Sequence, residues 1–278
     1  VNEVEFDLAG LQSTFSRAYG TAGSTPFGTA NDYTDASNVL KILKDNGSPV
    51  SDNQLVLNTS AGANFIGKQS AVNSAGTDSM LRQGVLLDLA GMPLRESAQI
   101  NNHTAGSAAN ATTNNAGYAV GATVLTLASA GTGALLAGDV VTFAGDTNKY
   151  VVASGDANVS GGGTITLAAP GLRKAIGTSA TAITVVGSSA RNMAFNRSAI
   201  VLAARAPARP EEGDMAEDVM LITDPRSGLT MELQCTKATE KYVTKLVWLG
   251  VLRTSSQSIP LYCWAKSETS HLFRGVAF

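Results

Sequence analysis

The stretch SARNMAFNRSAIVLAARAPARP, residues 189–210, decides how the rest of the chain is organised, together with LITDPRSGLT at residues 221–230. Apolar side chains between Met193 and Arg205 predict a helix, with most of them directed into a core. The segment Ala206–Pro210 ends this helix, because proline has no amide hydrogen to donate and clashes with the preceding turn. The first stretch is therefore expected to be a helix followed by an irregular segment.

The second stretch has the composition of a tight turn between two strands. Asp224 stands directly before Pro225, which presets the backbone for a turn, and Gly228 closes it. The apolar runs Val219–Thr223 and Leu229–Leu233 on either side predict an antiparallel hairpin. We interpret Asp224, Pro225 and Gly228 as structural turn residues, since their pattern requires no ligand.

The start of the chain predicts an amphipathic helix with one buried stripe, which Gly20 ends. Apolar residues recur there every three or four positions, at Val1, Val4, Leu8, Leu11, Phe15 and Ala18. No capping residue precedes Val1, so the pattern indicates that the chain enters partway along a longer helix.

Four shorter elements are expected between this helix and residue 101. They are a helix from Ala36 to Leu43 capped by Thr34 or Asp35, a strand at Gln54–Leu57, a helix at Ala61–Val72 and an extended segment at Met92–Ile100. Asn46-Gly47 is expected to stop the first of them. The resemblance to a known family described below implies that Phe65 and Ile66 of the second helix face the core.

From His103 onward the composition changes to short β-branched runs separated by Gly, Asp or Asn turns. The expected strands are Thr123–Leu127, Asp139–Phe143, Tyr150–Ala153, Thr164–Leu167 and Ile183–Val186. Strands at this spacing predict a small all-β barrel or sandwich, which we place at residues 105–188. Asp139, Asp146 and Asp156 lie in its turns, where an aspartate most often caps the turn through its own side chain.

Composition limits the classes of function. The chain has 278 residues, of which 44% are hydrophobic and 15% charged, enough for a sizeable core. Its net charge of -2 provides no basic field to attract nucleic acid. No apolar run approaches the roughly 18–20 residues that span a bilayer, so no membrane association is expected. Cys235 and Cys263 are expected to be reduced.

The sequence contains one enzyme-like motif, Gly62–Lys68, which has the G-x4-G-K spacing of a phosphate-binding loop. Gln69 occupies the position where such a loop needs a magnesium-binding hydroxyl, and bulky Phe65 and Ile66 fill the loop. The two histidines and two cysteines lack the close spacing of zinc sites, and no serine lies in a nucleophile-elbow motif. We therefore expect no enzymatic activity, no metal and no cofactor.

Several ordered blocks resemble the major capsid (coat) proteins of tailed bacteriophages, specifically the short-tailed enterobacterial phages. The block N-M-A-F-x-R-x-A-I-x-L-A-x-R at Asn192–Arg205 ends in a proline-rich step, and the D-P-R-S-G turn follows it. The segments Met80–Ile100 (MLRQGVLLDLAGMPLRESAQI) and Tyr118–Val151 also resemble this family. The similarity extends from Val1 to about Met231 and fades beyond it.

The resemblance implies an α+β, HK97-like capsid fold with a spine helix, an antiparallel sheet, an axial domain and an inserted all-β domain. Residues 1–104 would form the capsid core, spine helix and first part of the axial domain, and residues 105–188 the insertion. Residues 189–278 would return to the core, ending in a tail from about residue 254 with no family counterpart. The family's N-terminal arm and extended loop are absent before Val1, so a truncated or processed form is expected.

The same resemblance implies a virion protein, assembled in the bacterial cytoplasm into an icosahedral shell around double-stranded DNA. Its partners would be further copies of itself, a scaffolding protein and a portal, with DNA enclosed non-specifically. We single out seven candidate inter-subunit contacts, because arginine suits bidentate pairing with carboxylates: Arg191, Arg197, Arg205, Arg209, Glu211, Glu212 and Asp214. Two alternatives remain open: a nucleotide-binding protein using Gly62–Lys68, and a secreted β-rich adhesion or carbohydrate-binding module.

Overall fold

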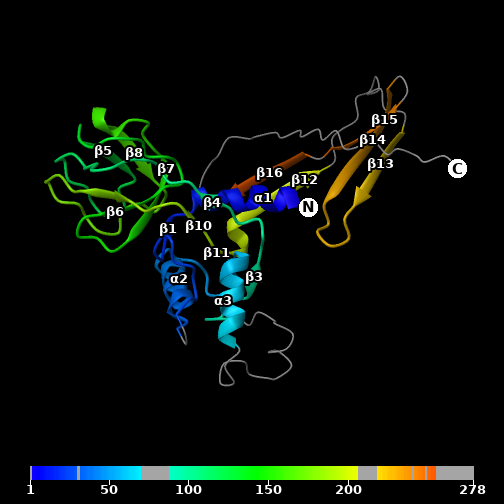
Figure 1. The fold of residues 1–278 in the computed structure, drawn as a ribbon, viewed down its shortest axis with the longest axis horizontal. Coiled ribbons are helices and arrows are strands. Elements are labelled where there is room, and N and C mark those ends of the chain that lie inside the picture. Colours follow the sequence, from blue (N-terminus) through cyan, green and yellow to red (C-terminus); the bar gives the residue numbers. More distant parts are fainter. Residues whose placement is uncertain are drawn as a thin grey trace. The chain divides into compact units, whose positions relative to one another are not determined.

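The computed structural model describes residues 2–29, 32–69, 88–205, 218–238, 241–247 and 249–254. The fold is mixed α+β, with few helices and mostly antiparallel sheets, which confirms the predicted class. Contacts divide the chain into two compact units, Asn2–Ala199 and Ile200–Phe278. Each unit is described here by itself (Figure 1).

The predicted N-terminal helix is much shorter than the periodicity indicated. Helix α1 spans Asn2–Gly10 and is followed by the single 3₁₀ turn η1 at Leu11–Thr14. Phe15 is already extended, and β1 (Arg17–Ala18) pairs with a strand of the β-rich region. The expectation of a helix up to Gly20 was therefore wrong, because strand pairing by β1 outweighs the helical spacing of the apolar residues.

Three of the next predicted elements are present. Helix α2 spans Thr34–Asp45, with Asn46 as its C-cap. Strand β2 spans Asn53–Leu57, and helix α3 spans Thr59–Gln69. They share a core in which Phe27 and Tyr33 pack edge-on against Phe65. Phe65 is buried as predicted, whereas Ile66 is only partly buried. The predicted capping of α2 by Thr34 or Asp35 is absent, since Tyr33 is the N-cap and makes no side-chain cap.

One small sheet joins segments that are distant in the sequence. Strand β2 pairs in parallel with β3 (Leu94–Glu96) and antiparallel with β11 (Met193–Asn196). Just beyond this sheet, β4 (Asn102–His103) pairs with β10 (Ser189–Ala190). The chain therefore leaves at β4 and returns at β10, side by side, and about 85 residues lie between them.

The segment from Met193 to Arg205 is not the predicted helix. It consists of β11, the 3₁₀ turn η3 (Arg197–Ala199) and strand β12 (Ile200–Arg205). Met193 pairs with Val56 of β2 and is buried beside Ile100. Tertiary pairing with β2 thus overrides the helix-forming alanines and leucine of this stretch.

The residues between β4 and β10 form the predicted β-rich region, which we call the insert (residues 105–188). Its strands are β5 (Val124–Leu127), β6 (Val140–Phe143), β7 (Lys149–Ser154), β8 (Gly163–Leu167) and β9 (Ile183–Val185). They form an antiparallel sheet in the order β5-β8-β7-β6-β9, drawn in green in Figure 1, and a short 3₁₀ turn η2 (Val159–Gly161) precedes β8. All five strands confirm the predictions, while the domain boundaries at 105 and 188 stay a prediction.

In the second unit, β12 pairs with β16 (Leu249–Thr254), and β13 (Asp218–Thr223) forms a three-stranded sheet with β14 (Thr230–Ala238) and β15 (Lys241–Val247). The turn between β13 and β14 is the predicted hairpin. Asp224 accepts hydrogen bonds from the amides of Arg226 and Ser227, and Gly228 has a φ of 70°. A left-handed φ of this kind favours glycine, which explains Gly228.

Candidate functional site

Two groups of polar side chains lie where the insert contacts the rest of its own unit. One group surrounds Asp139 beside the paired strands β4 and β10. The other joins β7 to the end of α2 and to β1. Buried polar groups require partners, so these contacts show how the insert is attached.

Asp139 is completely buried, and among the described residues the hydrogen bonds that it accepts come from within this unit. His103 Nε2 lies 2.8 Å from Oδ1, and the amide of Leu136 donates to Oδ2 at 2.7 Å. The amide of Gly106 reaches both carboxylate oxygens, at 3.0 and 3.1 Å. A carboxylate only accepts, so Nε2 carries the proton in the contact with His103. These donors offset the cost of burying the charge.

Close packing around Asp139 also explains why position 106 is a glycine. A Cβ atom there would lie 2.4 Å from the carbonyl oxygen of Ala134 and 2.5 Å from Oδ2 of Asp139. No other residue could therefore place its amide so close to the carboxylate. The cluster joins His103, before the insert, to residues within it.

Arg191, a predicted inter-subunit contact, lies next to this carboxylate. Its Nη1 donates to the carbonyl oxygen of Gly138, and Nη2 has no partner among the described residues. Burial lowers the pKa of Arg191, while the negative charge of Asp139 acts in the opposite direction. The guanidinium is thus engaged within its own chain.

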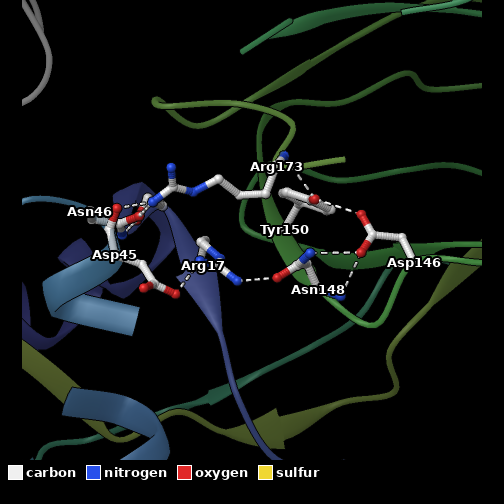
Figure 2. Close-up of polar contacts among 8 residues, drawn as sticks. Arg17, Asp45, Asn46, Asp146, Asn148, Tyr150 and Arg173 are labelled. Atoms are coloured by element: carbon white, nitrogen blue, oxygen red, sulfur yellow. Dashed lines mark hydrogen bonds and ion pairs between the residues drawn. The ribbon is translucent and has the colours of Figure 1, made fainter. Parts of the chain in front are cut away.

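The second group is shown in Figure 2, where two arginines approach the end of α2 from different segments. Arg17 of β1 donates through Nη2 to Oδ1 of Asn148, and its Nη1 lies 3.9 Å from the carboxylate of Asp45. Arg173 of the insert donates to the carbonyl oxygen of Asp45 and, at 3.3 Å, to Oδ1 of Asn46. Asp45 is therefore shared by both arginines.

Asp146 organises the insert side of this group (Figure 2). Its Oδ1 accepts from the amide and the side chain of Asn148 at 2.9 and 2.7 Å, and its Oδ2 accepts from the hydroxyl of Tyr150 at 2.6 Å. The same hydroxyl accepts from the amide of Arg173 at 3.0 Å. Burial, and then the hydrogen bond to Asp146, raises the pKa of Tyr150.

The predicted turn capping by aspartate is confirmed at two positions. Asp146 caps its turn through the amide of Asn148, and Asp156 does so through the amide of Asn158 at 2.7 Å. Asp139 instead accepts from Leu136, three residues earlier, and from residues outside the insert's strands. Within the described ranges, no three His, Cys, Asp or Glu side chains come together to hold a metal ion.

The remaining predicted contact residues are dispersed. Arg197 is exposed in η3, where its amide donates to the carbonyl oxygen of Asp52, and Arg205 is exposed at the end of β12. The rest lie outside the described residues: Arg209, Glu211, Glu212 and Asp214. At the hairpin turn, hydrogen bonds from Ser227 and from the Arg226 amide lower the pKa of Asp224.

The phosphate-loop motif is helical in the structure. Gly62–Lys68 lies entirely inside α3, and the amide of Gly62 donates to the carbonyl oxygen of Asn58 within that turn. Lys68 lies over the rings of Phe27 and Tyr33, 5.4 and 5.3 Å from their centroids. A phosphate loop needs backbone amides that converge outside a helix, so this geometry gives the nucleotide alternative no support.

Sequence reasoning missed Arg17, Asp45, Asn46 and Arg173 as a group. Arg17 lies within the segment that is predicted to be helical up to Gly20, and Asn46 is predicted only to stop α2. No sequence motif relates residues so far apart in the chain. Of the residues in this group, only Asp146 was predicted to make a side-chain contact, through the turn pattern around it.

Comparisons with models of known protein families and with curated protein sequences find no match. None of the helices in the described part of the chain is long and apolar enough to cross a membrane.

Proposed function

We propose that this chain is a structural protein, the major capsid protein of a tailed phage or prophage, with an HK97-like fold. The observation that carries the proposal is the sheet β11-β2-β3, which combines strands from both sides of the insert. An α+β host interrupted by an inserted β domain is the architecture that the family resemblance predicts. The ordered sequence blocks, above all Asn192–Arg205, supply the rest of the support.

In this role the protein acts through its shape. Many copies assemble into a closed lattice around a scaffolding protein and a portal, and DNA is then enclosed without specific recognition. Each copy makes several modest contacts, and these add up because every subunit is held by several neighbours. The net charge of -2 fits a container better than a nucleic-acid binder.

Among the described candidates, Arg197 and Arg205 have the exposure that inter-subunit ion pairing requires. Arg191 is directed toward Asp139 and serves its own chain instead. We therefore assign lattice contacts to the two exposed arginines, with carboxylates of neighbouring copies as their partners.

Sedimentation velocity and negative-stain electron microscopy of the purified chain, across a range of protein concentrations, test the proposal. Regular shells or sheets that grow with concentration are expected. A chain that binds a nucleotide or a glycan saturably and stays monomeric at every concentration up to about 100 µM would contradict it.

A charge reversal sharpens the test. Arg197→Glu should reduce the fraction of assembled protein while circular dichroism stays unchanged, because the side chain is exposed. Arg197→Lys is the matched control, since it keeps the charge and should retain most of the assembly. Equal assembly by both variants would exclude Arg197 as a contact.

A further inference from the structure

The insert has a hydrophobic core of its own. In the part of the chain that the structure describes, the side chains of its main cluster, from Ala108 to Val185, all belong to the insert. Leu125, Val141, Val152 and Ile165 are fully buried in it. A folded body with a self-contained core does not depend on its attachments to remain folded.

The insert is attached to its unit at two places that differ in character. One is the pair β4–β10 with the buried carboxylate of Asp139, which includes the covalent connections. The other is where β1 and the end of α2 meet β7: Ala18 of β1 packs against the cluster of Val140, Val151 and Ala168, and the side chain of Asp45 is 44% exposed. The hydrogen bonds of Arg173 at this place are exposed, whereas Asp139 is fully buried. Exposed polar contacts open more readily than buried ones, so this second contact is the one that can release first.

Arg173 completes the C-terminus of α2. The amides of Asn46, Gly47 and Ser48 already use the carbonyl oxygens of Ile42, Lys44 and Leu43. The carbonyl oxygen of Asp45 is left over, and Arg173 of the insert donates to it. A cation is also favoured at this end by the helix dipole. The insert therefore supplies the last cap of a helix outside itself.

Arg17 makes the same connection from the opposite direction. Its side chain is only 7% exposed, and it spans from Asn148 of the insert to Asp45 of α2. On the insert side, Asp146 positions both contact points: it holds Asn148 directly and holds the amide of Arg173 through Tyr150. One carboxylate on each side, Asp146 and Asp45, thus organises the whole contact.

We propose that these residues form a latch that fixes the orientation of the insert: Arg17 and Arg173 hold the insert to Asp45 and Asn46, and opening the latch frees the insert as a folded body. The insert then pivots about the β4–β10 strand pair, which stays closed around Asp139. Opening also breaks the two residue pairs between β1 and β7, Arg17 with Tyr150 and Ala18 with Lys149. The latch goes beyond the capsid proposal and does not depend on it.

Hydrogen–deuterium exchange on the whole chain tests the latch, with Arg173→Ala as the first variant. Amides at residues 15–20 and 44–48 should exchange about three- to tenfold faster, the factor expected for losing one or two exposed charged hydrogen bonds. Amides of β5 and β8 should keep their wild-type rates, because the insert stays folded. Asn46→Ala tests the latch from outside the insert and should also speed exchange in both segments, although residues 15–20 respond to it directly as well, because Nδ2 of Asn46 donates to Oγ of Ser16 at 2.9 Å.

Lys174→Ala is the matched control. Its Nζ donates to the carbonyl oxygen of Gly145 inside the insert, so removing it leaves the α2 contact intact and should not change residues 15–20 or 44–48. Asp146→Asn should loosen both arginine contacts together and speed exchange in both segments. Wild-type exchange at 15–20 and 44–48 in Arg173→Ala and Asn46→Ala would overturn the latch. Faster exchange throughout β5 and β8 would overturn it as well, since the contact would then be part of the insert's folding.

Discussion

The insert and the sheet β13-β14-β15 are both antiparallel and rich in apolar residues. They differ in whether those apolar side chains are buried. In the insert, Leu125 and Ile165 are completely buried. On β13, by contrast, Met220, Leu221 and Ile222 are 54%, 57% and 37% exposed. Neighbouring residues of a strand point to opposite faces, so β13 exposes apolar side chains on both of its faces.

This difference shows that the apolar content of a sheet does not by itself tell whether the single chain buries the sheet's apolar side chains. The insert encloses the apolar side chains of its main cluster because loop and turn residues pack against them, as the buried Ala111, Val159 and Leu172 demonstrate. Because the apolar side chains of β13 stay exposed in the single chain, their burial contributes little to the free energy of folding. Matched substitutions in the two regions should therefore have very different costs.

The largest effect is expected for Leu125→Ala in the insert. Leu125 is fully buried, so the change removes transfer free energy and leaves a cavity, at a cost of about 2–5 kcal/mol. Urea unfolding followed by pulsed hydrogen–deuterium exchange measures the insert separately from the second unit. A loss below about 1 kcal/mol would mean that the core of the insert relaxes around the cavity.

The sequence predicted the insert well because its signals are local. Short β-branched runs end at Gly, Asp or Asn turns, and each strand was placed within two residues, for example Ile183–Val185. The hairpin turn at Asp224 was predicted for the same reason, since its residues alone define the turn. Although β5 pairs with β8 and β6 with β9, local patterns sufficed here because apolar runs and turn residues mark the ends of each strand whatever its partner.

Prediction failed where distant partners decide the structure. Phe15 has the spacing of a helical residue, but it packs beside Phe195 with ring centroids 6.3 Å apart, and the next residues pair with β7. Met193–Asn196 forms a strand because it pairs with β2, which lies more than 130 positions earlier in the sequence. The contacts of Asp139 and Asp45 were missed for the same reason: their partners lie far away in sequence, and nothing in a single sequence connects them.

A smaller but still large effect is expected for Asp139→Asn. An amide presents one oxygen and one NH₂ group, so at least one of the donors from Gly106, Leu136 and His103 loses its acceptor in a buried site. An unsatisfied buried donor costs about 1–3 kcal/mol. The same unfolding experiment gives the loss, and Asp156→Asn is the control because its Asx turn is exposed. Equal losses in the two variants would show that the Asp139 cluster is no stronger than an ordinary turn.

A further effect is confined to alkaline pH and concerns Tyr150. Its pKa in the folded chain is raised above the ordinary value of 10.0, first by burial and then by Asp146. The neutral phenol therefore stabilises the fold fully below pH 10.0, and this contribution is lost as the pH rises through the folded pKa. Thermal melting across this range should fall more steeply for the wild type than for Tyr150→Phe, which cannot ionise. Parallel curves would mean that Tyr150 ionises without any cost to the fold.

The smallest effect is expected for Leu221→Ala, the chemical counterpart of Leu125→Ala. Leu221 is more than half exposed, so truncation removes little buried area, and the change in unfolding free energy should stay within about 0.5 kcal/mol. Val124→Ala is a useful control in the insert, because Val124 has a similar exposure of 54% but lies next to Leu125 on the same strand. If both exposed positions tolerate alanine while Leu125 does not, burial alone explains the contrast between the two sheets. If Leu221→Ala instead destabilises the chain by more than 1 kcal/mol, β13 is covered in solution, and its sheet is stabilised by a contact that the single chain does not make.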